Sequence, residues 1–272
     1  VTADPHLYLH LQPQGEGIRV APGVQPFGEG PRFLPGEGGS TVIAEVNGQR
    51  VQAERDLAQE REIAHKVLEA CDGLFAEDGG FWRFANLEQA LEWLLVLRDM
   101  ADDVICAWPE GKSLKVGTVA GASSLSLSVR EKTDWFEVDG ELALDEDRVF
   151  DLQKLLAIMQ HAPGRFIQLG EDEFVALTDG LRRRLDTLRS VMVDGQVPRL
   201  GGYQLDTIVD EITLDADSGF TAFRERLGAA RDLNVPLPTT FDGELRDYQR
   251  DGFQWLVRLA AWGAGACLAD DM

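Results

Sequence analysis

Turn signals between neighbouring apolar segments are the feature that most constrains the fold of this chain. Asn47-Gly48 divides residues 42–51 into two short β-like runs, and Gly-Glu-Asp-Glu at 170–173 separates Arg-Phe-Ile-Gln-Leu from Glu-Phe-Val-Ala-Leu. We also interpret Asp139-Gly140 as a tight turn inside residues 134–144. Such short connections join antiparallel strands, whereas parallel strands need a long crossover. The sequence up to residue 234 therefore predicts an α+β fold with antiparallel hairpins, not a doubly wound βα alternation.

The first 20 residues predict two strands. Leu7, Leu9 and Leu11 alternate with polar or aromatic residues, and Ile18 and Val20 repeat this spacing after a turn-like segment. A period of two places each set on one face of a half-buried strand. Further apolar runs predict strands at 103–108, 114–119 and 124–129.

Amphipathic helices are predicted between these strands. Apolar residues recur at helical spacing in each of them, and Asn86 is well placed to cap the second. The predicted helices span residues 54–71, 86–100, 148–160, 178–192, 205–212 and 219–231. Two prolines in residues 234–243 then predict a linker and a domain boundary.

Composition limits the function classes. Of 272 residues, 26 are Lys or Arg and 47 are Asp or Glu, which gives a net charge of −21. A chain this acidic repels phosphate backbones, so a general nucleic-acid-binding surface is disfavoured. Three cysteines, Cys71, Cys106 and Cys267, lack CxxC spacing, which favours a reducing compartment and buried thiols. We find no membrane-spanning or signal segment in the sequence and expect a soluble cytoplasmic protein.

One local basic cluster is the exception to the acidic composition. Arg182, Arg183, Arg184 and Arg189 lie within one predicted helix, above Leu181, Leu185 and Leu188. The cluster could contact nucleic acid or an acidic partner. The more conservative interpretation is the solvated side of an amphipathic helix whose arginines pair with nearby carboxylates.

We identify no complete catalytic or metal-binding motif in the sequence. GxSxG, HExxH, EF-hand and P-loop patterns are absent, and His6 and His10 share a strand face without a nominated third ligand. We therefore predict no catalytic residue and no metal site within these 272 residues.

Residues 241–272 differ in character from the rest. An amphipathic helix over 244–262 is followed by Gly263 and Gly265 and by Ala-Cys-Leu-Ala, a short apolar run typical of a buried strand. A strand at this point would lack its neighbours, so we expect the chain to be a fragment of a larger protein.

The motifs of this segment carry a resemblance. Leu245-Arg246-x-Tyr248-Gln249, Gly252-Phe253-x-Trp255-Leu256 and Leu268-Ala269-Asp270-Asp271-Met272 occur in this order. They resemble the entry to the ATPase core of Swi/Snf-type DNA translocases, the helicase-like proteins of superfamily two. Two departures are Asp247, where proline is common, and Asp271, where many members carry Glu and bacterial members often carry Asp.

The resemblance implies a fold and an organisation. It implies that 245–272 is the first helix and strand of an α/β RecA-like lobe, reached through a linker at 235–244. It extends more loosely over 121–234, an accessory α+β region in bacterial members, and leaves 1–120 without a role.

The resemblance also implies ligands and partners. Leu245, Arg246, Tyr248 and Gln249 would surround the adenine of ATP, with Mg²⁺ bound by a P-loop that follows Met272. Double-stranded DNA would be bound by ATPase lobes outside these residues, in a cytoplasmic, nucleoid-associated protein.

Three roles remain open for the preceding residues. They are a regulatory domain that gates the ATPase, an acidic module that recruits a protein partner such as the transcription machinery, and a DNA-binding module built on the arginine cluster. The net charge of −21 favours the first two.

The purified 272-residue chain is expected neither to hydrolyse ATP nor to bind it tightly, because the phosphate-binding lysine of the resembled family is not among its residues. A phosphate-release assay against a mock preparation measures this directly. Turnover above the mock preparation would contradict the prediction.

Overall fold

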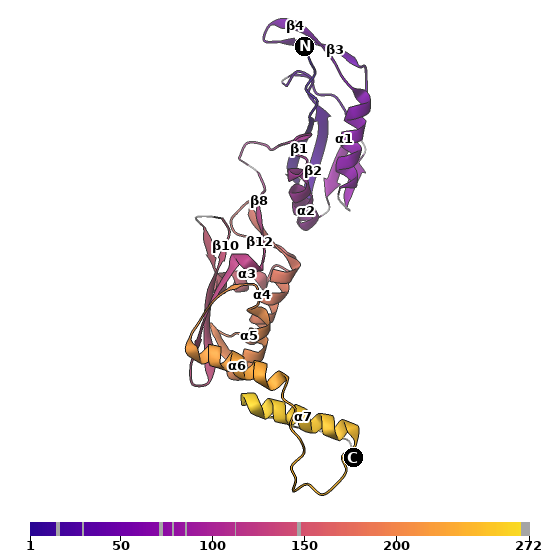
Figure 1. Cartoon of the computed structure of the whole chain (residues 1–272). Coiled ribbons are helices and arrows are strands. Elements are labelled where there is room, and N and C mark those ends of the chain that lie inside the picture. The colour runs from indigo at the N-terminus through magenta and orange to yellow at the C-terminus, as the bar shows by residue number, and fades with distance from the viewer. Residues whose placement is uncertain are drawn as a thin grey trace. The chain divides into compact units, whose positions relative to one another are not determined.

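The computed structural model describes residues 1–14, 17–28, 30–70, 73–77, 79–84, 86–111, 113–145 and 148–267. They have an α+β fold, and the chain divides into two compact units (Figure 1). Unit 1 comprises residues 1–117 and 166–176, and unit 2 comprises residues 118–165 and 177–272.

The main sheet of unit 1 is built around the strands predicted at the N-terminus. Its strand order is β5-β6-β2-β1-β7, antiparallel except for the parallel pair β1–β7. Leu7, Leu9, Leu11, Ile18 and Val20 are all buried, which confirms their predicted inward face. The strands are β1 (Leu7–Gln14), β2 (Gly17–Val24), β5 (Leu74–Glu77), β6 (Phe81–Phe84) and β7 (Val104–Ala107).

Helices α1 (Leu57–Glu69) and α2 (Leu87–Arg98) pack on this sheet. Asp56 caps α1 and Asn86 caps α2, each accepting from backbone N–H groups of the first turn. The Trp93 indole is fully buried between the helices and donates to the Val67 carbonyl at 3.3 Å. The two helices are therefore joined by both apolar packing and a buried hydrogen bond.

The predicted Asn47-Gly48 hairpin is confirmed. It joins β3 (Thr41–Val46) to β4 (Gln49–Glu54), and φ is 53° at Asn47 and 75° at Gly48. Both central residues of a type I′ turn need positive φ, which is why this dipeptide predicts the turn so well.

A buried ion pair fixes the Gly- and Pro-rich segment that follows β2. Arg55 and Glu60 side chains are 0% and 9% exposed, and their closest atoms lie 2.6 Å apart. Glu60 also accepts from the Gly36 N–H at 2.8 Å, while Arg55 donates to the carbonyls of Leu34 and Glu37. These backbone groups of the loop are therefore hydrogen-bonded by the two side chains, and not by a neighbouring strand or helix turn.

A second sheet of unit 1 contains the predicted hairpin at 166–177. The strand order is β12-β13-β8, and Leu91, Val116, Phe166, Phe174 and Ala176 form its apolar core. The strands are β8 (Lys115–Ala120), β12 (Phe166–Gln168) and β13 (Glu173–Leu177).

Unit 2 is a sheet covered on one face by helices (Figure 1). The strand order is β11-β10-β9-β15, with β14 also paired to β10 and β15 parallel to β9. The strands are β9 (Leu125–Glu131), β10 (Trp135–Ala143), β11 (Val149–Asp151), β14 (Gln196–Pro198) and β15 (Thr213–Ala216). The helical elements are η1 (Ala122–Ser124), α3 (Leu152–Met159), α4 (Asp179–Val191), η2 (Arg199–Gly201), α5 (Gly202–Ile208) and α6 (Ser218–Arg231).

The tight turn predicted at Asp139-Gly140 is wrong. Both residues lie inside the continuous strand β10, and the hairpin turn falls instead between β9 and β10. A Cβ at position 140 would lie 2.5 Å from the Ser126 carbonyl oxygen and 2.7 Å from Leu127 Cδ2. Glycine is therefore needed here for close approach of a neighbouring strand, not for a turn.

Aromatic side chains form the centre of unit 2. The Phe136 ring of β10 lies 5.1 Å from Phe220 and 5.0 Å from Phe223, both on α6. A Cβ at Gly202 would lie 2.6 Å from Phe136 and 2.7 Å from Phe223, so α5 can start against these rings only with glycine at that position. This cluster fixes α5 and α6 to the sheet.

The cysteines only partly match their predicted burial. Cys106 is half-buried, and burial raises the pKa of its thiol to about 11, so it is poorly reactive at neutral pH. Cys267 is exposed, which corrects the prediction of a buried thiol, and Cys71 lies outside the described residues. None of the helices in the described part of the chain is long and apolar enough to cross a membrane.

Replacing Glu60 by Ala is expected to lower the free energy of unfolding by about 3 kcal/mol, because it leaves the buried Arg55 guanidinium without its carboxylate. Urea denaturation measures the change. Glu62→Ala on the same helix is the matched control, since Glu62 is exposed and pairs with the exposed Lys66. Equal effects of the two substitutions would contradict the structural role of the buried pair.

Candidate functional site

The helix that carries the C-terminal motif begins three residues later than expected. Helix α7 spans Asp247–Trp262 and ends at Gly263, where φ is 90°. At its start the Arg246 N–H donates to Gln249 Oε1 at 3.0 Å, which satisfies the backbone at the point where the helix begins. The glycine provides the left-handed C-terminal conformation that a side chain would disfavour.

The residues expected around adenine lie together at this helix start. Leu245 is half-buried, whereas Arg246, Tyr248 and Gln249 are exposed, with Tyr248 55% exposed. Gln249 Oε1 is used for capping, while its Nε2 has no hydrogen-bond partner among the described residues. One aromatic face and one free amide donor are thus presented to solvent at a helix N-terminus.

The buried strand predicted after α7 is not formed in the described residues. Ala266 and Cys267 are exposed and outside any strand. The rest of the predicted strand and the motif at 268–272 lie outside the described residues. Backbone groups of a buried strand need neighbouring strands, and the described residues provide none here.

Further along its length, α7 contacts the rest of unit 2. The Gln254 side chain accepts from the Val235 N–H at 3.0 Å and donates to the Val235 carbonyl at 2.7 Å. Arg258 Nε donates to the Leu233 carbonyl at 2.9 Å, and the Trp262 ring lies edge-on to Phe223 with centroids 5.9 Å apart. These contacts connect α7 to α6 and to the segment that leaves it.

Sequence reasoning missed Gln254, Arg258 and Trp262 as a functional set. Their spacing of four residues was visible, but their partners are backbone groups and an aromatic ring outside the helix. The Trp at position 262 inside an apolar stripe was the available signal.

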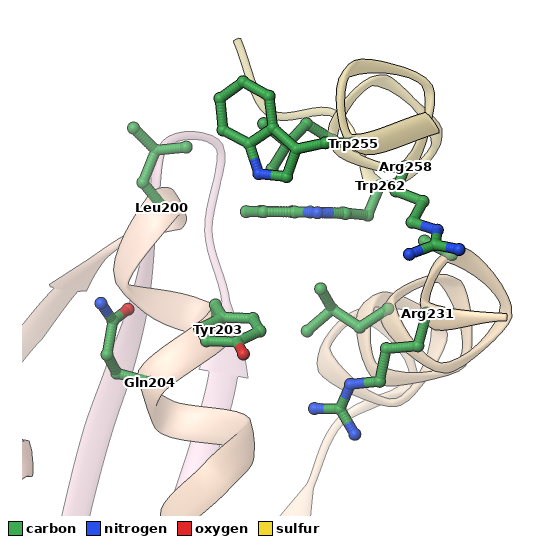
Figure 2. A pocket seen from close by; sticks show the side chains of 10 residues that line it. Leu200, Tyr203, Gln204, Arg231, Trp255, Arg258 and Trp262 are labelled. Carbon is green, nitrogen blue, oxygen red and sulfur yellow. The ribbon is translucent and has the colours of Figure 1, made fainter. Parts of the chain in front are cut away.

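An apolar groove of about 440 Å³ lies beside these contacts (Figure 2). Tyr203 from α5 faces Trp255 and Trp262 from α7 across it, and Trp255 is 46% exposed. Arg231 and Arg258 are the charged residues of its described lining. The docking of α7 therefore leaves aromatic surface accessible.

The α6 side of this groove is stabilised by a buried carboxylate. Asp206 on α5 accepts from Arg224 at 2.7 Å and from Arg231 at 2.8 Å, and its own side chain is 10% exposed. One carboxylate with two arginines joins α5 to α6. Arg231 is thereby held as a structural cation rather than left free for a ligand.

The predicted basic cluster is largely neutralised in the structure. Arg182 pairs with Asp186 at 3.0 Å and donates to the Gly164 carbonyl at 2.6 Å. Arg189 also pairs with Asp186, at 3.3 Å, and Arg184 pairs with Glu211 at 3.1 Å. Arg183 is exposed and has no carboxylate partner among the described residues. This geometry supports the amphipathic-helix interpretation more than a nucleic-acid interface.

Within the described residues no group of three or more His, Cys, Asp or Glu side chains is arranged to hold a metal ion. His6 instead pairs with Asp4, and Tyr8 donates to the same carboxylate at 2.7 Å. Burial, together with this bond, raises the pKa of Tyr8 to about 12. This cluster belongs to the N-terminal strand and is remote in sequence from α7.

Comparison with known proteins relates part of the chain to a helicase-like protein. The chain is 32% identical over 114 residues to a Bacillus subtilis (strain 168) protein with the name "Putative ATP-dependent helicase/translocase YwqA". The match covers 40% of this chain and only 11% of that protein. No protein-family model matches the chain, and no solved structure matches it.

Replacing Arg183 by Glu is expected to leave the affinity of the chain for duplex DNA unchanged. The neighbouring arginines are already paired with carboxylates, so Arg183 is not part of a cluster of free cations that could bind phosphates. Fluorescence anisotropy of a labelled duplex at two salt concentrations measures this. Arg226→Glu, an exposed arginine on α6, is the matched control. Weaker binding by Arg183→Glu alone, with a salt slope reduced by about 1, would establish a phosphate contact instead.

Proposed function

We propose that this chain is the N-terminal accessory region of an ATP-dependent DNA translocase of the Swi/Snf type, joined to the first helix of its ATPase core. The observation that carries the proposal is the geometry of α7. Its later turns are attached to the rest of unit 2 through Gln254, Arg258 and Trp262, while Tyr248 and Gln249 at its start remain exposed. The similarity to a helicase or translocase from Bacillus subtilis supports the same class.

The residues at the start of α7 fit the adenine of ATP. The Gln249 amide has an unused donor, and the Tyr248 ring is available for stacking. Arg246 and Leu245 flank them and would enclose the base. ATP bound with Mg²⁺ would supply the phosphoryl group for hydrolysis, and the phosphate-binding and DNA-binding residues would belong to lobes that follow residue 272.

The role proposed for the preceding residues is regulatory. The rest of unit 2 contacts the helix that would bind adenine, so a conformational change there can shift the proposed nucleotide site by moving this helix. The alternative is an acidic module that recruits a protein partner, and the net charge of −21 favours this role and the regulatory one equally. A recruitment module has no need of contact with α7, and this contact is why we favour the regulatory role.

The test uses the complete gene product and the substitution Gln249→Glu. Glutamate keeps an oxygen that accepts from the Arg246 N–H, so the helix cap is retained, but it loses the amide donor proposed to bind adenine. We expect duplex DNA to stimulate ATP hydrolysis by the wild type. We expect the variant to raise KM for ATP about tenfold and to lose its preference for ATP over GTP.

Glu244→Gln is the control for a change of side-chain charge near the site, because Glu244 is exposed and precedes the motif. Absence of ATP hydrolysis by the complete wild-type protein would contradict the proposed function. An unchanged KM in Gln249→Glu would contradict the proposed adenine site.

A further inference from the structure

We propose that Gln254, Arg258 and Trp262 form a coupling row through which the rest of unit 2 positions the adenine-binding end of α7. The inference rests on the proposed function and names how its nucleotide site is regulated. None of the three residues would touch ATP, so they are positioning residues. Their partners are the backbone at 233–235 and the Phe223 ring.

The row lies further along α7 than the adenine motif. Its members are spaced by four residues and therefore lie along one side of the helix. At 3.6 residues per turn, Gln249 is rotated by roughly 140–180° from the members of the row, whereas Tyr248 is rotated by roughly 120° from Gln254 but by only about 40° from Trp262, from which it is separated by about 21 Å along the helix axis. The rest of unit 2 thus holds α7 while Tyr248 and Gln249, proposed to bind ATP, stay exposed.

The hydrogen bonds of the row are specific in geometry. The Gln254 amide both accepts from and donates to Val235, so it pairs with this backbone as a neighbouring strand would. Arg258 repeats the contact one turn later on the Leu233 carbonyl. Together they align the segment leaving α6 with α7 and fix the rotation of the helix about its axis.

Trp262 joins this row to the centre of unit 2. Its ring contacts Phe223, which in turn packs on Phe136 of the sheet and Phe220 of α6. Successive ring contacts therefore connect β10 with the last turn of α7.

The attachment of α7 is shallow, which suits a contact that is made and released. All of its residues are described, and none of them is fully buried. Trp255 remains 46% exposed at the groove next to the row. An interface held by a few hydrogen bonds and one ring can change state at a small energetic cost, whereas a fully packed core cannot.

The first experiment measures attachment of α7 in the 272-residue chain, independently of ATP. The double variant Gln254→Met/Arg258→Met keeps side-chain length and removes the hydrogen bonds. We expect amide hydrogen exchange over 250–262 to accelerate about tenfold or more relative to the wild type. Arg226→Met removes an exposed arginine from α6 and is expected to exchange as the wild type does.

The second experiment measures ATP hydrolysis by the complete gene product carrying the same substitutions. We expect the double variant to raise KM for ATP at least fivefold while kcat stays within twofold, because positioning of the adenine site is lost and the chemistry is not. Gln254→Glu keeps the acceptor for the Val235 N–H and loses the donor, so its KM should lie between the wild type and the double variant.

The outcomes separate this inference from the proposed function. A complete protein that hydrolyses no ATP would contradict the proposed function. It would also overturn the coupling row, because the row rests on that function. Active protein in which the double variant leaves KM unchanged, or lowers only kcat, overturns the coupling row and leaves the function standing. Unchanged exchange over 250–262 in the double variant also overturns it.

Discussion

The aromatic contact between sheet and helices organises the part of this protein that bears on function. Phe136 on β10 contacts Phe220 and Phe223 on α6, and Phe223 contacts Trp262 at the end of α7. Burial of these rings stabilises unit 2, and their edge-on and tilted arrangements fix how the elements meet. The placement of α7, and with it of the motif at its start, depends on this chain of rings.

Helix α7 combines an attached part with an exposed start. Its inner side is bound by backbone carbonyls and by Phe223, and its start leaves an amide donor and a tyrosine ring exposed. The buried Asp206 of α5 accepts from Arg224 and Arg231 of α6 and so fixes these two helices to each other. Under the proposed function, an accessory region built this way would influence the nucleotide site without contributing a catalytic group.

Much of the local structure could be predicted from the sequence, because short-range chemistry decides it. Alternation at Leu7, Leu9 and Leu11 identified a strand, and Asn47-Gly48 identified its turn, since few residues accept positive φ. Gly140 was misread because a glycine required for close strand approach looks, in sequence, like a glycine required for a turn.

The candidate site was predictable only as a motif. Leu245 to Gln249 could be singled out by resemblance, but the contacts of Gln254 and Arg258 could not, because their partners are backbone groups of residues 233 and 235. The arginine cluster shows the same limit. Its positive charge is evident in sequence, while its neutralisation by Glu211 depends on a contact between residues 27 positions apart.

Photo-crosslinking of the complete gene product with 8-azido-ATP, followed by peptide mapping, tests the central claim most directly. The account predicts an adduct within residues 245–250, at the exposed start of α7, and competition by unlabelled ATP. Specific labelling confined to residues 1–240, with none on this helix, would contradict it.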